Sequence, residues 1–467
     1  MLKNKRFSFT EGPMFFKMLL FALPIMATGI LQTLYSMADN IIVGQFSGDP
    51  NALGAVGSTS SLTNLTINLL IGISVGTSVV VSQAFGAKNE NMVSRVVHTA
   101  LITGLIGGVA FMGIGFLVSK PALVLMGTRE ELLDGALLYF RIICIGIPAT
   151  AIYNFGAAIL RSVGDSKTPL IILSSSGLIN VGLNFLFVIF CNMSVEGVAI
   201  ATIVSQYLSA IAVIAVLFTR RDECYGFSPS KLSFDTSLFI RIIRFGIPSG
   251  IQSSIFSFSN VLLTSGINSL GSSAIKAYTI SSNIDAITYT ACNAFHQASL
   301  TFTGQNFGAG KPDRIKKVAF FSLLQVLVMS ILIAQIELLF SDQLINLYIS
   351  NSDAAKAEIT QITKDLMLLL LSTYFICGLM DVLSGIMKGM GYAIIPMLIS
   401  VTFICGFRIM WRFLVFPLPQ FNTPTGLMLC YVFSWSLTAI AFIPFIIAKI
   451  VKLKRKKKQE SRDYATV

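Results

Sequence analysis

Twelve long apolar runs constrain the fold of this chain more than any other feature of its sequence. Each is about 20 residues or longer, the length at which a helix crosses the hydrocarbon core of a bilayer. Helices are predicted because backbone polar groups cannot stay unpaired in hydrocarbon, and the runs are too continuously apolar for the strands of a membrane barrel. The runs cover residues 14–36, 57–82, 98–119, 136–158, 170–190, 197–218, 243–267, 278–302, 318–340, 362–386, 393–416 and 427–448. The sequence therefore predicts an all-α integral membrane protein with twelve transmembrane helices.

The composition supports this prediction. Of the 467 residues, 54% are hydrophobic and 12% are charged, and the mean hydropathy is +0.76, whereas a soluble chain carries about 25% charged residues. The seven cysteines stand singly, mostly inside the apolar runs, without the spacing of a metal site or a disulfide framework. We expect no bound metal and no cofactor.

The distribution of Lys and Arg predicts the orientation, because these residues accumulate on the cytoplasmic side of a membrane. If the N-terminus is inside, most of the 34 basic residues fall in cytoplasmic segments, so both termini are predicted to be cytoplasmic. The net charge of +12 reflects this asymmetry together with the tail "KLKRKKK" (452–458). We expect the tail to lie against anionic membrane lipid rather than to bind nucleic acid.

An internal repeat divides the chain into two halves. The stretch "QAFGAKNENMVSR" (83–95) recurs as "QNFGAGKPDRIKK" (305–317), each copy after the second run of a group of six. The second copy resembles a nucleotide-binding loop, but it lacks the Walker spacing, and its recurrence favours a tight cytoplasmic turn. Two other pairs recur at nearly the same offset: "ALPIM" (22–26) with "GIPSG" (246–250), and "LRSVGDSKTP" (160–169) with "MKGMGYAIIP" (387–396).

The repeat predicts the domain organisation. The two six-helix halves are expected at residues 1–218 and 243–448, joined by a cytoplasmic linker at 219–242 and followed by a basic cytoplasmic tail at 449–467. Because six is an even number of spans, the two bundles should be related by a pseudo-two-fold axis along the membrane normal, as in secondary transporters. No cytoplasmic stretch is long enough for an ATPase domain, so we expect an ion gradient or the substrate's own gradient to supply the energy.

We select three carboxylates as candidate ion-coupling or substrate-binding residues: Asp39, which follows the stretch "LQTLYSMA" (31–38), and Asp285 and Asp381, which lie within apolar runs. A carboxylate can exchange a proton, ligate a hard cation or attract a cationic substrate. The alternatives are an outer-interface position for Asp39 and a structural hydrogen-bond network for Asp381. Asn154 occupies the place equivalent to Asp381 in the first half and joins the candidates.

Polar residues interrupt the second and eighth runs, which hold equivalent positions in the two halves. We expect Asn64 and Asn68 in one run, and Asn283 in the other, to line a cleft, with helix–helix hydrogen bonding as the alternative. Arg408 of the eleventh run is a further candidate for the cleft lining. It shares a face of that run with Arg412, and the two arginines either pair with an acid or extend outward. For the lone histidines, His98 and His296, we favour a polar helix contact over a proton relay.

Several phrases resemble a known family: "TEGPMFFKMLLFALPIM", "LQTLYSMADNIIVG", "QAFGAKN", "ILRSVGDSKTP" and "GQNFGAGKPDR". Between about residues 10 and 448 the chain resembles the multidrug and toxic compound extrusion transporters, in the bacterial branch near the DNA-damage-inducible type. This resemblance implies a twelve-helix exporter in a bacterial cell membrane that expels amphipathic organic cations in exchange for protons or sodium ions. It implies neither an enzyme nor an obligate protein partner.

The resemblance also implies roles for particular residues. The acids of the family in the first and tenth spans fall on Asp39 and Asp381, and Asp285 matches an acidic position in the eighth span of similar members. Asn180 and Asn184 stand where some relatives carry Asn-x-x-x-Asp. The stretch "QSSIFSFSN" (252–260) lacks the glutamate of sodium-using relatives. These two departures favour coupling to protons over coupling to sodium.

Two other classes of function remain as alternatives. A flippase of lipid-linked oligosaccharides from the same superfamily would share the repeat, but it would more often have additional spans and a strongly basic cleft. A membrane enzyme would need a nucleophile, a base or a metal cluster, and isolated histidines and cysteines supply none of these.

Overall fold

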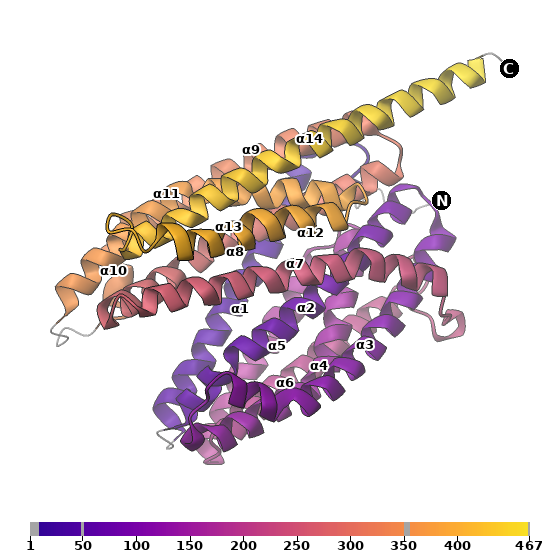
Figure 1. Ribbon diagram of the computed structural model, residues 1–467. Helices are drawn as coiled ribbons and strands as arrows, with labels where there is room; N and C mark the ends of the chain where they lie inside the picture. Colours follow the sequence, from indigo (N-terminus) through magenta and orange to yellow (C-terminus); the bar gives the residue numbers. More distant parts are fainter. Residues whose placement is uncertain (1–8, 48–50, 350–354, 466–467) are drawn as a thin grey trace. The chain divides into compact units, whose positions relative to one another are not determined.

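The computed structural model describes residues 9–47, 51–349 and 355–465, and these residues form helices with no β-strand among them (Figure 1). Ten helices are long and apolar enough to span a membrane, and α7 and α8 are equally long but more polar. The segments are α1 Met14–Phe46, α2 Ala52–Gly86, α3 Glu90–Leu125, α4 Glu130–Ser162, α5 Lys167–Asn184, α6 Val195–Thr219, α7 Thr236–Asn268, α8 Ser272–Gly308, α9 Pro312–Leu339, α11 Lys356–Gly389, α12 Ile394–Ser400 with α13 Phe407–Met410, and α14 Pro424–Ala465. Each predicted run falls on one of these twelve segments, so the predicted twelve-span all-α fold is confirmed.

Two of the spans contain π-helical turns. The span of α5 continues as a π-helix over Phe185–Phe190. The span of α12 and α13 includes π-helices at Val401–Gly406 and Trp411–Val415. Figure 1 shows α12 and α13 as parts of one continuous helix. These are the fifth and eleventh spans, which the repeat makes equivalent. Because π-turns occur frequently at functional sites, both spans are candidates to carry functional residues.

The described chain packs into two compact units. Unit 1 runs from Ala27 to Gly250, and unit 2 contains the start of α1 up to Met26 together with the chain from Ile251 onwards. Helices α1 and α7 therefore each contribute to both units. The predicted division of the chain at residues 218 and 243 and the predicted symmetry axis stay predictions.

The helices inside each unit pack in the same pattern. In unit 1, α4 contacts α2, α3 and α6, and in unit 2, α11 contacts α8, α9 and α14. The repeat makes α4 equivalent to α11, and it makes the three neighbours of one equivalent to those of the other. Small buried residues such as Ala149 and Ala157 give α4 its close contacts.

The repeated loops are tight turns. Lys88 has φ +57° after α2, and Gly310, its equivalent in the repeat, has φ +63° after α8. A second equivalent pair, Gly164 and Gly391, has φ +101° and +84°. Glycine adopts this left-handed region without the steric cost that Lys88 bears. The geometry agrees with a turn and not with a nucleotide-binding loop.

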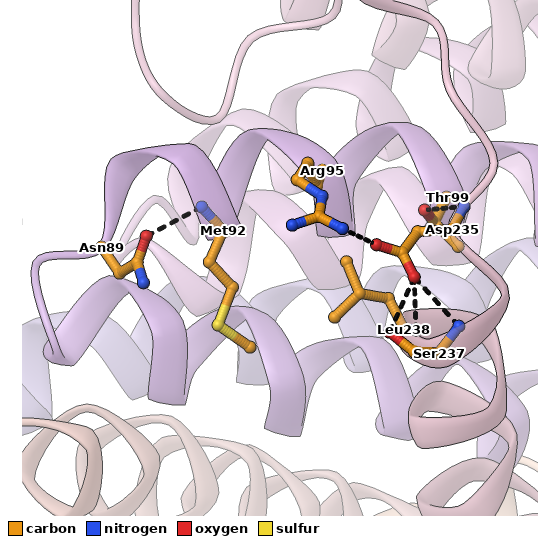
Figure 2. Close-up of polar contacts among 7 residues, drawn as sticks. All are labelled: Asn89, Met92, Arg95, Thr99, Asp235, Ser237 and Leu238. Atoms are coloured by element: carbon orange, nitrogen blue, oxygen red, sulfur yellow. Dashed lines mark hydrogen bonds and ion pairs between the residues drawn. The ribbon is translucent and has the colours of Figure 1, made fainter.

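The segment before α7 is attached to α3 in unit 1. Figure 2 shows the Asp235 carboxylate beside Arg95, with which it forms an ion pair. The same carboxylate accepts hydrogen bonds from the Ser237 hydroxyl at 2.7 Å, the Ser237 N–H at 2.9 Å and the Leu238 N–H at 3.2 Å. The Ser237 hydroxyl is the main reason that the pKa of Asp235 lies below its usual value. Asp235 thus caps the start of α7 and fixes it to α3.

His98 completes this attachment. Its Nδ1 lies 2.7 Å from the Ser94 carbonyl oxygen, and its Nε2 lies 3.1 Å from the backbone nitrogen of Ser228. The ring also lies 5.6 Å from that of Phe227. The preferred interpretation of His98 as a polar contact on a helix agrees with these bonds.

Glycines set the crossing of α2 and α7 in unit 1. Gly72 and Gly76 stand four apart on α2, as do Gly246 and Gly250 on α7. A Cβ added to Gly72 would overlap the Cα of Gly250, and a Cβ on Gly76 would overlap the carbonyl oxygen of Ile242. The two backbones are therefore in direct contact, the arrangement that paired small residues allow in membranes.

This crossing predicts a specific sensitivity. Gly72→Ala should force α2 and α7 apart and lower the free energy of unfolding by about 1–3 kcal/mol, the usual cost of overpacking. Gly57→Ala is the matched control, because it lies on the same helix and its added Cβ has nothing within 4 Å. The midpoints of thermal unfolding of the purified proteins in detergent measure the difference. An unchanged midpoint for Gly72→Ala would contradict the direct backbone contact.

Candidate functional site

Unit 1 contains a hydrogen-bonded chain of polar side chains around Asp39 of α1. Asn184 of α5 donates from Nδ2 to Asp39 Oδ1 at 2.5 Å and to Asn180 Oδ1 at 3.4 Å. Asn180 donates in turn to Thr202 Oγ1 of α6 at 3.5 Å. Asn180 and Asn184 are one helical turn apart, so both lie on the face of α5 that meets α1 and α6. The structure thus brings three of the predicted site residues together.

Asn184 has one unused polar atom. Its Oδ1 is buried and has no hydrogen-bond partner in the described part of the chain. Unpaired buried acceptors are rare in proteins and call for a functional or structural reason. The π-helical turn of the fifth span begins at the next residue. The Oδ1 atom of Asn184 can therefore accept one further hydrogen bond.

Two tyrosines that the sequence analysis did not select help to place Asp39. The Tyr35 hydroxyl, one turn before Asp39 on α1, donates to the Ser174 carbonyl of α5 at 3.1 Å. The ring of Tyr35 lies so close to Gly177 that a Cβ there would overlap it. Tyr139 of α4 lies within electrostatic range of Asp39. The bonds of Tyr35 and Asp39 thus both join this part of α1 to α5, and the outer-interface alternative for Asp39 stays a prediction.

Glu337, Asp285 and Asp381 are acids in the interior of the spans of unit 2, and the sequence analysis missed the first of them. Glu337 of α9 is 4% exposed and accepts a hydrogen bond from Thr288 Oγ1 at 2.8 Å. Asp285, one turn from Thr288 on α8, is in electrostatic contact with Glu337. The Oε1 atom of Glu337 is buried and unpaired within the described residues. The sequence could have indicated Glu337, because it is the single acid in the apolar stretch "IAQIELLF" (333–340).

The third acid, Asp381 of α11, shares its helix with a buried lysine two turns later. Lys388 is 6% exposed and interacts electrostatically with Asp381. His296 of α8 approaches the backbone carbonyl oxygen of Asp381 through Nδ1 at 2.7 Å, so it contacts the main chain and not the carboxylate. No hydrogen bond to the Asp381 carboxylate occurs in the described part of unit 2. None of the ion pairs found in the described chain joins Asp381 to Lys388, and the choice between a functional carboxylate and a structural one stays a prediction.

The remaining candidates lie apart from these clusters. Asn154 of α4 donates to the Thr150 carbonyl oxygen one turn earlier on its own helix, at 2.9 Å. Asn64 of α2 and Asn283 of α8 are exposed, and Asn68 of α2 is half-buried. The predicted cleft-lining role of the last three stays a prediction.

Arg408 follows neither of its two predicted alternatives. It is 2% exposed, so it does not extend outward, and it forms no ion pair with a described acid. Its guanidinium instead lies 3.9 Å from the centre of the Tyr431 ring. Arg412, one turn later, lies 4.8 Å from the ring of Phe416.

Comparison with known proteins assigns the chain to a family. Residues 24–186 and 248–414 match the sequence model of the family MatE, one segment in each repeat. Probable multidrug resistance protein YoeA of Bacillus subtilis (strain 168) is 29% identical over 400 residues, which cover 84% of this chain and 85% of the relative. Probable multidrug resistance protein NorM of Thermotoga maritima is 25% identical over 390 residues, 81% of each chain.

A solved structure supports the fold. It is described as the outward-facing conformation of a multidrug resistance MATE family transporter of the MOP superfamily. The likeness has a TM-score of 0.87 at 21% identity and covers 97% of this chain and 99% of that one. Because the two family segments account for most of its length and its helices follow the same fold, the chain belongs to the MatE family.

Proposed function

We propose that this chain is a secondary antiporter that exports amphipathic organic cations in exchange for protons. The carrying observation is the set of carboxylates inside its membrane helices: Asp39 in unit 1, and Asp285, Glu337 and Asp381 in unit 2. Placing a charged side chain in a span costs at least ~2.5–3.5 kcal/mol on insertion scales. We therefore infer that these acids take part in transport. The relatives named as multidrug resistance proteins support organic cations as the cargo.

The proposed mechanism couples the proton and the drug by competition. An ionised carboxylate attracts a cationic substrate, and protonation from outside neutralises it and releases the substrate. Loss of the proton to the inside then restores the affinity for the next substrate. Because both ligands need the same negative charge, binding of one lowers the affinity for the other. Alternating access of the site to the two sides of the membrane turns this competition into transport.

The side-chain amide of Asn184 can hydrogen-bond to the Asp39 carboxyl group whether that group is ionised or protonated. When Asp39 is ionised, Nδ2 of Asn184 donates to it, as in the observed bond of 2.5 Å. When Asp39 is protonated, its O–H needs an acceptor, and Oδ1 of Asn184 is unpaired within the described chain. A side-chain amide can serve in either state after rotation, because it has both a donor and an acceptor. The choice of protons over sodium rests on the acids missing from the fifth and seventh spans, since a bound sodium ion prefers a cluster of oxygens that includes carboxylates.

A flippase of lipid-linked oligosaccharides is not favoured. Such a substrate carries phosphate groups, which would be repelled by the three acids of unit 2. We also propose that the protein resides in a bacterial cell membrane with both termini in the cytoplasm, where the basic tail meets anionic lipid. It works as a single-chain transporter of small molecules, without an enzymatic activity.

The first prediction tests the carboxylates. Asp39→Asn and Asp381→Asn should each reduce efflux of a fluorescent cation from cells to the level without the transporter, because an amide cannot exchange a proton. Asp285→Asn and Glu337→Gln should have the same effect. Asp134→Asn is the matched control, since Asp134 is an exposed residue of α4. Expression is followed by immunoblot, and normal efflux by a well-expressed variant would remove that residue from the mechanism.

The second prediction concerns the coupling ion. In proteoliposomes with the membrane voltage clamped, a pH gradient without sodium should drive accumulation of the fluorescent cation. A sodium gradient without a pH difference should drive none. The opposite pattern would mean that sodium is the coupling ion, and the Asn184 argument would then be wrong. Asp39→Asn liposomes measure the background leak.

A further inference from the structure

A pair of acids joins α8 and α9 of unit 2. The Thr288 hydroxyl of α8 donates to Oε2 of Glu337 in α9 at 2.8 Å. Asp285 stands three positions before Thr288, on the same face of α8, and it interacts electrostatically with Glu337. The fold therefore brings two carboxyl groups from different spans to neighbouring positions.

The two acids differ in their exposure. Glu337 is 4% exposed, whereas Asp285 is half-buried. A bound cation could therefore contact Asp285 but not Glu337. A positive charge that reaches Asp285 still acts on Glu337, because an electrostatic interaction in the low dielectric of a protein interior needs no direct contact.

Two buried polar atoms at this place have no hydrogen-bond partner in the described part of the chain: Oε1 of Glu337 and Oγ of Ser281. Ser281 is 1% exposed and lies one turn before Asp285, on the face of α8 that also carries Thr288. Unpaired buried polar atoms are rare and call for a reason. A proton bound by a carboxyl group turns one of its oxygens from an acceptor into a donor, and it needs no cavity.

No cation of the described chain forms an ion pair with either acid. The titratable groups that interact electrostatically with the pair cannot carry a positive charge, and they are Tyr374 and Cys377 of α11 and Cys292 of α8. Arg408 acts on Cys377 but on neither acid. Two neighbouring carboxylates without a cation strongly disfavour the state in which both are ionised. One of the two therefore holds a proton while no cation is bound.

We propose that Asp285 and Glu337 share one exchangeable proton, and that the pair releases this proton when a cationic substrate binds at Asp285. The O–H bond of one carboxyl group breaks, the proton passes to water, and the positive charge of the substrate stabilises the two carboxylates that remain. The Thr288 hydroxyl stabilises the ionised form of Glu337 by its hydrogen bond to Oε2. When the substrate leaves, the pair takes up a proton again.

This inference rests on the proposed exchange of organic cations for protons, and it concerns the number of protons exchanged. The pair counts as one proton site because its two acids are not both protonated and not both ionised while the substrate is absent. Its proton is additional to any that Asp39 or Asp381 exchanges. A singly charged substrate is then exchanged for more than one proton, so the transport cycle moves net charge across the membrane.

The pH dependence of substrate binding counts the protons. Rhodamine 6G is a dye with a single positive charge, and fluorescence polarisation with the purified full-length protein measures its Kd at a series of pH values. Each proton released on binding makes the Kd fall about tenfold for every pH unit at the acid end of the series. Glu337→Gln removes one proton site, so its Kd should fall about tenfold less per pH unit than that of the wild-type protein.

Three further variants separate the loss of the proton from a loss of packing. Glu337→Asp keeps a carboxyl group and should keep the pH dependence of the wild-type protein. Thr288→Val removes the hydrogen bond between α8 and α9 but keeps both acids, so it should keep the number of protons released. Asp285→Asn should behave like Glu337→Gln, and it decides the matter if Glu337→Gln cannot be purified in a folded form.

Transport by the wild-type protein provides a second test. In proteoliposomes with equal pH on both sides, a lumen-positive potential opposes the passive entry of rhodamine 6G. The same potential should drive accumulation of the dye through the transporter, because one positive charge enters while at least two protons leave. Liposomes without the protein measure the passive distribution of the dye.

Several outcomes would overturn the proposal. If Glu337→Gln bound the dye with the pH dependence of the wild-type protein, the acid pair would hold no exchangeable proton. If Thr288→Val lost as much of the pH dependence as Glu337→Gln, the effect would come from packing. An absence of voltage-driven accumulation would show a one-for-one exchange and refute the additional proton alone. If the wild-type protein did not bind the dye at any pH, the proposed export function would fail and this inference with it.

Discussion

Hydrocarbon offers no hydrogen-bonding partner, and this single fact governs the structure. It requires helices, and it confines the left-handed turns at Lys88 and Gly310 to the ends of spans. It also requires that every polar side chain within a span find a partner inside the protein. Most do so by bonding to a carbonyl of their own helix, as Asn154 does. The exceptions among the described residues are informative because an unpaired buried polar atom is unfavourable: they include the amide oxygen of Asn184 and the second carboxylate oxygen of Glu337.

The sequence predicted the helices and their repetition well. Length and apolarity decide whether a segment crosses the membrane, and both properties are local. Asp39, Asp285 and Asp381 were identified for the same reason, since the unfavourable position of an acid in or directly after an apolar run is visible in the sequence alone. Glu337 gave the same signal near the end of its run and was overlooked.

Partners could not be predicted, because they depend on which helix faces come together. The bond from Asn184 to Asp39 joins the fifth span to the first, across 145 positions of sequence. Lys388 lies just after the tenth apolar run, and its burial, with its electrostatic interaction with Asp381, is visible only in the packed helix. Arg408 was expected to pair with an acid or to extend outward, whereas stacking on Tyr431 required a tyrosine from α14. The sequence indicates which groups are unfavourable to bury, and only the packing shows which partners stabilise them.

The glycine crossing of α2 and α7 has a consequence for the repeat itself. At the positions of α8 equivalent to Gly72 and Gly76 the chain has Ala294 and Ala298, both fully buried, and Ala22 and Met26 of α1 replace Gly246 and Gly250. Where unit 1 has bare backbone at these four positions, unit 2 therefore has side-chain carbon. Because glycine lets two helix backbones approach more closely than alanine or methionine does, a crossing of α1 with α8 at these positions could not be as close as that of α2 with α7.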